Sequence, residues 1–211
     1  MELKEKMTII KNRIIIITGF LLIIIGIFIY IFNLLSINIV ETTNEKKIEE
    51  FINVQIKLSP VISNADNIAS NNEQKITESK ENYIAVIEIP KINLKEGIYS
   101  KDSKLNNVDK NIKLLKESDM PDIEKGNMIL AGHSGTGRTA FFNNLIELEK
   151  ADVVNIYYNN YKYSYKVINM YSINKTGKIS LNISNSKSRL ILITCDMNDK
   201  TKQLVFICEQ N

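Results

Sequence analysis

The stretch RLILITCD, from Arg189 to Asp196, decides how the rest of the chain is interpreted. Its four consecutive aliphatic residues are bounded by a Ser/Asn/Lys cluster and a Met-Asn-Asp-Lys turn, which is typical of a buried β-strand. Cys195 is then the last residue of that strand, at a rim where a rigid element holds the thiol open to a partner. A buried structural cysteine is the usual alternative, so a working thiol needs a second group.

The second group is His133, the only histidine of the protein. It ends another apolar run, Gly126–His133, which is also predicted to be a strand. An imidazolium beside a thiol favours the thiolate, and the imidazole then serves as general acid or base. Two strand ends meeting at one rim would pair His133 with Cys195. Solvated polar residues also fall at strand ends, so the spacing alone leaves both interpretations open.

From Asn82 onward the sequence consists of short apolar runs separated by polar turns. Strands are predicted over 83–90, 126–133, 153–158, 161–169, 190–195 and 204–208, with short extended pieces at 91–94 and 97–99. Asn159-Asn160 is predicted to form a tight hairpin turn. Many short strands with few helices predict an all-β sandwich or barrel.

Two segments of this region have helix-like apolar spacing. Phe141–Leu148 is predicted to be a short helix with Phe142, Leu145 and Ile146 on one face. Ser103–Ser118 is mixed, with apolar residues at helix-like spacing between polar ones. Both segments interrupt the strands, and neither changes the all-β prediction.

The segment 14–36 is predicted to be a transmembrane signal-anchor. No charged residue occurs between Ile14 and Val40, and a bilayer core needs roughly 20 apolar residues. A cleaved signal peptide is the rival, but its apolar region is shorter and ends at a small-x-small site, for which Asn33–Ser36 is a weak match. Basic residues in 1–13 and acidic residues after the anchor place the N-terminus in the cytoplasm and the rest outside.

Residues 37–81 are polar and are predicted to be a spacer between the anchor and a domain over 82–211. Within the spacer, Lys46–Leu58 has the apolar positions of a short amphipathic helix. Simple disorder without a specific role is the alternative for the remainder.

Charge excludes one class of partner. The chain has 211 residues and a net charge of +3, of which +2 lies in residues 1–13. The remainder therefore has no strong single-sign field with which to bind nucleic acid.

The second cysteine, Cys208, is predicted to be an unpaired buried thiol. If the last two predicted strands form a hairpin, Gln203 lies near Cys195 and Cys208 lies about 16 Å away, at about 3.3 Å per residue. A disulfide needs Cα atoms within about 7 Å, so Cys195 stays free.

Three segments in this order resemble the sortase family. They are Ile87–Ile92 (IEIPKI), Gly126-Asn127 leading into Ala131-Gly132-His133, and Thr194-Cys195 after an aliphatic run. The resemblance covers 82–209 and implies a closed barrel of about eight strands. It also implies a transpeptidase of Gram-positive bacteria that cleaves a sorting signal similar to Leu-Pro-x-Thr-Gly. The acyl group passes to an amine of the cell wall or of a pilin.

By this resemblance, Cys195 is the nucleophile that forms an acyl-thioester and His133 is the proton donor and acceptor. The family's third residue is an arginine at the start of the following strand, where this chain has Gln203. Glutamine donates hydrogen bonds to an oxyanion without a charge, so it is the weaker stabiliser. Lys202, Arg138 and Thr194 are the other candidates for stabilising the oxyanion or positioning the substrate. An exposed loop arginine is the preferred interpretation of Arg138.

No cofactor is predicted. One histidine and no clustered cysteines argue against a catalytic metal. Carboxylates at 117, 119, 122 and 124 are the candidates for calcium, as in some sortases, but a solvated acidic loop is the preferred interpretation. Two alternative functions stay open: a sortase-like domain that binds sorting signals or pilins without turnover, and a thiol hydrolase with water as acceptor.

Overall fold

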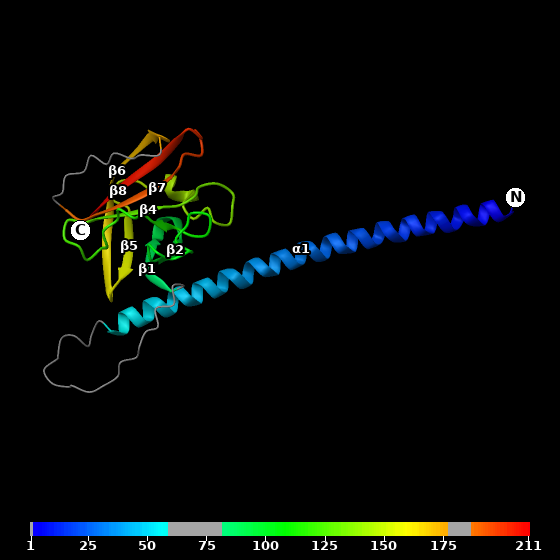
Figure 1. Ribbon diagram of the computed structural model, residues 1–211, viewed down its shortest axis with the longest axis horizontal. Helices are drawn as coiled ribbons and strands as arrows, with labels where there is room; N and C mark the ends of the chain where they lie inside the picture. The colour runs from blue at the N-terminus through cyan, green and yellow to red at the C-terminus, as the bar shows by residue number, and fades with distance from the viewer. Residues whose placement is uncertain (1, 59–81, 177–186) are drawn as a thin grey trace, which may run out of the picture. The chain divides into compact units, whose positions relative to one another are not determined.

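The computed structural model of the protein describes residues 2–58, 82–176 and 187–211 (Figure 1). The chain divides into two compact units, Met1–Lys47 and Ile48–Asn211. The first unit is helical, and its helix α1 (Glu2–Leu58) continues to the end of the first described range. The spacer predicted over 37–81 is therefore helical as far as Leu58, and its remainder lies outside the described residues.

Helix α1 contains the segment predicted to be the membrane anchor. Of the described residues, one stretch, Ile15–Phe32, is long and apolar enough to cross a bilayer, with a mean hydropathy of 3.0 over 18 residues. Its side chains are exposed. A stretch of this kind near an N-terminus fits a single-pass anchor, and a signal sequence has the same character.

The second unit is built on an eight-stranded sheet, as predicted. The strands are β1 (Tyr83–Ile89), β2 (Leu94–Tyr99), β3 (Lys113–Leu114), β4 (Asn127–Ala131), β5 (Val153–Tyr158), β6 (Tyr161–Asn174), β7 (Arg189–Cys195) and β8 (Lys202–Gln210). Their order in the sheet is β2-β1-β5-β6-β8-β7-β4-β3. The pairs are antiparallel except β4 and β7, which run parallel.

The two outer strands of this order, β2 and β3, are linked through a side chain. Asn111, two residues before β3, donates from its side-chain nitrogen to the carbonyl oxygen of Gly97 in β2 at 3.0 Å. The amide of Asn111 thus takes the place of a ladder hydrogen bond, and the sheet is nearly closed into a barrel. The prediction of an all-β barrel with about eight strands is confirmed.

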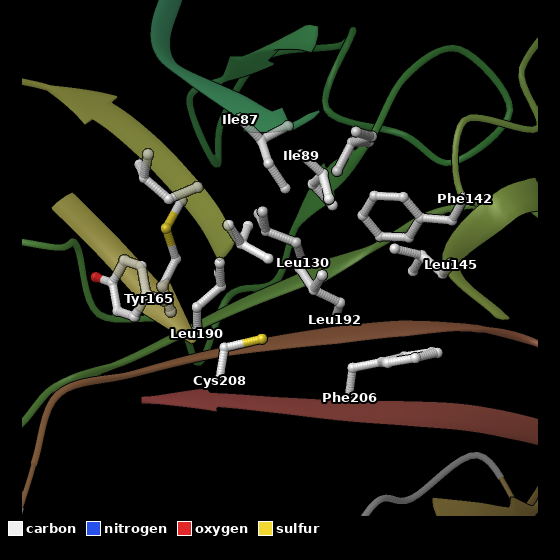
Figure 2. Packing of buried hydrophobic residues seen from close by; sticks show 14 of the residues in the cluster. Ile87, Ile89, Leu130, Phe142, Leu145, Tyr165, Leu190, Leu192, Phe206 and Cys208 are labelled. Carbon is white, nitrogen blue, oxygen red and sulfur yellow. The ribbon is translucent and has the colours of Figure 1, made fainter. Parts of the chain in front are cut away.

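The interior of the barrel is one apolar cluster to which all the long strands contribute (Figure 2). Leu190 and Leu192 of β7, Leu130 of β4 and Phe206 of β8 face one another there. The sulfur of Cys208 points into the same cluster, and the residue is fully buried. Strand β7 is buried along almost its whole length, which explains its run of aliphatic residues.

The hairpin between β5 and β6 is confirmed. Asn159 and Asn160 form its turn with φ values of 47° and 66°. Left-handed conformations at both central residues match the right-handed twist of the flanking strands, and asparagine tolerates them. Strand β6 extends further than predicted, to Asn174, with a bulge between Val167 and Asn169.

The piece at 91–94 is not extended as predicted. Residues Pro90–Ile92 form the 3₁₀ helix η2, and Asn93 ends it in the left-handed region with φ of 51°. Proline starts the turn because its φ is already restricted to helical values. Strand β2 then begins at Leu94.

The predicted helix Phe141–Leu148 is a 3₁₀ helix, η3 (Asn143–Glu147), and of its predicted apolar face Phe142 and Leu145 are buried as predicted, whereas the placement of Ile146 was wrong. Phe142, Leu145 and Leu148 are at most 2% exposed, whereas Ile146 is 49% exposed. A spacing of three residues between buried positions matches the three residues per turn of a 3₁₀ helix.

The segment Ser103–Ser118, described from its sequence as mixed, forms turns and the short strand β3. Asn106 organises it, because its side chain accepts from the N–H of Leu114 at 2.7 Å and donates to the carbonyl of Leu114 at 2.9 Å. These two hydrogen bonds satisfy the N–H and the carbonyl of Leu114, as a neighbouring strand would. The segment therefore has partners for its backbone without forming a helix.

Candidate functional site

The parallel register of β4 and β7 brings the two candidate catalytic residues to one rim. Ala131, the last residue of β4, pairs with Ile193 of β7, so paired residues differ by 62 in number. His133 and Cys195 differ by the same 62, and each lies two residues beyond that last pair. Cys195 is the last residue of β7, and His133 is the second residue after β4, so the backbones of both residues lie at the same edge of the sheet.

Three hydrogen bonds continue the contact between these strands beyond the ladder. The N–H of Gly132 donates to the carbonyl of Ile193 at 3.1 Å. The hydroxyl of Thr194 donates to the carbonyl of Gly132 at 2.9 Å. The hydroxyl of Ser134 donates to the carbonyl of Cys195 at 2.7 Å. These bonds fasten the backbone on both sides of His133 to the backbone around Cys195.

A glycine is required at position 132 because the ring of Phe142, the residue before η3, lies close to the backbone that follows β4. A Cβ atom at this position would lie 2.9 Å from the ring of Phe142, nearer than real Cβ atoms come. The N–H of Phe142 also donates to the carbonyl of His133 at 2.9 Å. The backbone of His133 is therefore held between β7 and the segment that begins η3.

In the described part of the chain, the imidazole of His133 has one side-chain hydrogen-bond partner. Its Nε2 lies 3.1 Å from Oδ1 of Asp109, in the loop between β2 and β3. The two side chains are 41% and 75% exposed. The site is therefore open to solvent on the side of this pair.

Cys195 is a free, partly exposed cysteine beside a cavity of about 170 Å³. Phe142, Ile146 and Leu204 form an apolar side of this cavity, and Asn143 and Asn198 contribute polar groups. Cys208 is fully buried, and burial raises the pKa of its thiol to about 12.

Gln203 is the candidate that the structure places next to Cys195. The two residues are direct partners in the antiparallel pairing of β7 and β8, so their side chains are on the same face at neighbouring positions. Lys202, one residue earlier, projects to the other face, where its Nζ is 3.4 Å from Oδ2 of Asp199.

The other two candidates lie in different settings. Thr194 is 4% exposed, and the hydrogen of its hydroxyl is donated to Gly132 as described above. Arg138 is exposed in the loop that follows β4. The structure therefore places Gln203 beside Cys195, and the register of β4 and β7 brings the backbone of His133 to the same edge of the sheet.

The acidic segment considered for calcium has a local role for one carboxylate. Oδ2 of Asp119 accepts from the N–H of Asn127 at 2.9 Å. Within 2–58, 82–176 and 187–211, no group of three or more His, Cys, Asp and Glu side chains is arranged to hold a metal ion. The absence of a cofactor stays a prediction.

Sequence reasoning did not single out Asp109 and Ser134 as parts of the site. Asp109 is 24 residues from His133, in a polar loop, and no motif or spacing connects the two. Ser134 adjoins His133, and its contact to Cys195 follows from the parallel register of β4 and β7, which is a tertiary feature.

Comparison with known proteins identifies the family. The model of the Sortase domain matches residues 87–211, which is more than half of the chain, and the chain belongs to the sortase family. No curated protein matches it at a significant level.

Solved sortase structures share the fold. A sortase D5 transpeptidase of Clostridium perfringens is 20% identical with a TM-score of 0.56, over 81% of this chain and 99% of its own. Sortase A from Corynebacterium diphtheriae is 18% identical with a TM-score of 0.55, over 78% and 84%. The C. perfringens sortase C structure with the C-terminal cell wall sorting motif is 22% identical with a TM-score of 0.55, over 80% and 87%.

Proposed function

We propose that this sortase is a membrane-anchored cysteine transpeptidase with Cys195 as nucleophile and His133 as its proton donor and acceptor. It cleaves a sorting signal similar to Leu-Pro-x-Thr-Gly through an acyl-thioester and transfers the acyl group to an amine of the cell wall or of a pilin. The observation that carries the proposal is the parallel register of β4 and β7, which ends both strands at one rim.

In the first half-reaction, the sulfur of Cys195 bonds to the carbonyl carbon of the scissile peptide, and the thiol proton resides on the imidazole of His133. The tetrahedral intermediate then collapses as the carbon–nitrogen bond breaks. The leaving nitrogen takes the proton from His133 and departs as an amine. The acyl group remains on Cys195 as a thioester.

In the second half-reaction, an acceptor amine attacks the thioester and transfers a proton to His133. The carbon–sulfur bond breaks, and the sulfur of Cys195 recovers its proton or leaves as thiolate beside the imidazolium. The free enzyme and a new amide bond result. No group outside the protein and its two substrates is required, so we propose that turnover needs no metal and survives chelation with EDTA.

Gln203 is the residue that we propose in place of the family arginine. Its position directly across the ladder from Cys195 lets the side-chain amide reach the oxygen of the tetrahedral intermediate. An uncharged amide donor stabilises an oxyanion less than a guanidinium does. We therefore expect slower acylation than in sortases that carry the arginine.

The proposed location is the cell membrane of a Gram-positive bacterium, with a single pass over 14–36. Residues 1–13 are proposed to be cytoplasmic, because their basic side chains precede the apolar stretch. The domain 82–211 is then extracellular, where surface proteins or pilins with sorting signals and the acceptor amines are found.

A second candidate function is motivated by the same Gln203. A domain without turnover would still bind a sorting signal or a pilin at this rim. A thiol hydrolase would form the same thioester and use water in place of the amine. The three functions differ only in which half-reactions occur.

Intact-mass analysis of the full chain in detergent micelles distinguishes them. The protein is incubated with a panel of sorting-signal peptides, with and without triglycine or a diamino acid. We expect an acyl adduct that disappears on addition of amine, together with the transpeptidation product. An adduct lost equally fast without amine indicates a hydrolase, and no adduct with any peptide contradicts the proposal. Cys195→Ala is the negative control, and Cys208→Ala is the matched control that keeps the reacting thiol.

A further inference from the structure

We propose that Asp109 is a positioning residue for His133. Through its hydrogen bond the carboxylate orients the imidazole and selects its tautomer. The inference rests on the proposed function of His133, and it assigns a specific role to a residue outside the sheet. Its geometric basis is the contact of 3.1 Å between Oδ1 of Asp109 and Nε2 of His133.

The turn that carries Asp109 is closed by its own hydrogen bonds. The side-chain oxygen of Asn107 accepts from the N–H of Asp109 at 3.1 Å. The carbonyl of Asn107 accepts from the N–H groups of Lys110 at 2.9 Å and of Asn111 at 2.8 Å. The backbone at Asp109 is thus set by three bonds to one residue, although the carboxylate itself is exposed.

The turn is also anchored on both sides. Asn106, before it, is 8% exposed and makes two hydrogen bonds with the backbone of Leu114. Asn111, after it, is 4% exposed and bonds to Gly97 of β2, and Ile112 is fully buried. The loop is therefore fastened to β2 and β3, and it presents the carboxylate to the rim from a defined place.

Because the side chains of Asp109 and His133 are both exposed, their contact is expected to affect the rate of the reaction more than the stability of the fold. Ion pairs between exposed side chains contribute little to stability, because water screens the charges. An orienting contact on a reacting imidazole acts on the rate instead, since proton transfer depends on the direction of the ring nitrogen. Loss of Asp109 is expected to change turnover without unfolding the barrel.

The chemistry of the carboxylate decides the tautomer. An ionised carboxylate only accepts hydrogen bonds, so Nε2 of the neutral imidazole must carry the hydrogen. Nδ1 is then the nitrogen without a hydrogen. It takes the proton of the Cys195 thiol, gives it to the leaving amine, and later takes a proton from the acceptor amine. Throughout these steps the hydrogen on Nε2 stays with Asp109.

The sole histidine of the chain makes the tautomer directly measurable. In the full chain labelled with ¹⁵N and held in detergent micelles, the imidazole nitrogens of His133 give one set of two-bond ¹H–¹⁵N correlations. We expect neutral His133 to be entirely in the Nε2–H form in the wild type. In Asp109→Ala we expect a mixture of tautomers like that of a solvated histidine. An Nδ1–H form in the wild type, or an unchanged spectrum in the variant, overturns the proposal.

Kinetics provide the second measurement. Asp109→Ala is expected to lower kcat for transpeptidation about tenfold, with the KM for the peptide unchanged. Asp109→Asn, which keeps an oxygen acceptor, is expected to recover part of the loss. Asp102→Ala removes the same charge from an exposed position of the same loop and is expected to leave kcat unchanged. Equal losses in Asp109→Ala and Asp102→Ala, or a loss confined to KM, overturn the proposal.

The tautomer measurement also separates this inference from the proposed function. If the wild type forms no acyl adduct, the proposed function fails, yet the spectrum of His133 still reports on Asp109 without substrate. If adducts form normally in Asp109→Ala and the spectrum is unchanged, the proposed function stands and the role of Asp109 is wrong. Should Asp109→Ala fail to fold, the wild-type spectrum and Asp109→Asn still decide the inference.

Discussion

The two ends of the hairpin formed by β7 and β8 place the same kind of side chain in opposite surroundings. At the rim, Cys195 of β7 pairs with Gln203 of β8, and its thiol is partly exposed beside a cavity. Toward the other end, Cys208 of β8 pairs with Leu190 of β7, and its thiol points into the core. The two cysteines thus lie toward opposite ends of one strand pair. Cys195 is accessible for reaction, and Cys208 is packed in the core.

The two thiols differ in the surroundings that control the reactivity of a cysteine. Burial raises the pKa of the Cys208 thiol to about 12, because the thiolate would lose its hydration inside an apolar cluster. Cys208 is therefore a neutral, inaccessible thiol at physiological pH. Cys195 is partly exposed, and His133 follows β4, the strand that runs parallel to β7.

The end of the hairpin beyond Cys208 is stabilised by ion pairs and lies away from the candidate site. Nη2 of Arg189 is 2.8 Å from Oε1 of Glu209, and Nζ of Lys187 is 3.2 Å from Oε2. Arg189 is 7% exposed, so this ion pair is partly shielded from water. Substitutions at this end should change stability, and substitutions at the rim should change turnover.

The largest expected effect is at Cys195. Cys195→Ala should abolish transpeptidation and the acyl adduct, because no other group of the site can form the thioester. Cys208→Ala, the matched change at the packed end, should keep turnover within about twofold at a temperature where the protein is folded. Product formation measured by mass spectrometry checks both. Turnover retained by Cys195→Ala would show that the nucleophile is assigned incorrectly.

Alkylation should separate the two thiols without any substitution. Iodoacetamide is expected to modify Cys195 at least about a hundredfold faster than Cys208 in the native chain, because only an accessible thiolate reacts. In denaturant the two rates should converge. Peptide mapping after timed quenching measures each site. Comparable native rates would mean that Cys208 is not packed as described.

Arg189→Ala tests the packed end for stability. Removing the guanidinium leaves the carboxylate of Glu209 without its main partner, and the free energy of unfolding should fall by about 2 kcal/mol. Turnover of the folded protein should be unchanged. Urea unfolding followed by tyrosine fluorescence measures the loss, since the chain has nine tyrosines and no tryptophan. If Arg189→Ala lowered kcat and left the free energy of unfolding unchanged, the proposal that this end of the hairpin serves stability and the rim serves turnover would be wrong.

Substitutions of Gln203, at the rim, are expected to change turnover and to leave stability nearly unchanged. Gln203→Ala should lower kcat about tenfold by removing a donor to the oxyanion, and Gln203→Arg should raise kcat above the wild type by adding charge. Neither should change the free energy of unfolding as much as Arg189→Ala does. Equal kcat in all three proteins would exclude a role for the side chain at this position.

The smallest expected effect is on the pH dependence of stability. The hydrogen bond from Arg189, followed by that from Lys187, lowers the pKa of Glu209. A lowered carboxyl pKa contributes stability that is present above the ordinary glutamate pKa of about 4.3 and is lost as pH falls through the folded value. Urea titrations at decreasing pH should therefore show the wild type approaching Arg189→Ala below that pKa. A constant difference down to the lowest pH would contradict this.

The sequence alone predicted the features that depend on short-range patterns. The apolar run of β7, the Asn159-Asn160 turn and the barrel class follow from side-chain alternation, turn chemistry and a family resemblance that the Sortase domain match confirms. The same patterns misled where local spacing was ambiguous. Positions 142, 145 and 148 are buried because η3 has three residues per turn, which apolar spacing read as an α-helix does not predict.

The composition of the site was only partly accessible from sequence. His133 and Cys195 were singled out because each ends an apolar strand, and Gln203 because the resemblance to sortases places it where that family has an arginine. Ser134 and Asp109 were not, because their contacts join residues 61 and 24 positions apart. The segment that contains Asp109 was described only as mixed, because no local pattern indicates that its asparagines bond to the outer strands of the sheet.

By itself, then, the sequence indicated the candidate residues His133 and Cys195 and the apolar N-terminal segment, because a thiol, an imidazole and an apolar run are visible in the residues themselves. The tertiary structure decided how these residues meet. The parallel register of β4 and β7 aligns His133 with Cys195, and the loop between β2 and β3 places Asp109 on the imidazole. Register and loop placement depend on the packing of the whole barrel, which no local segment of the chain encodes.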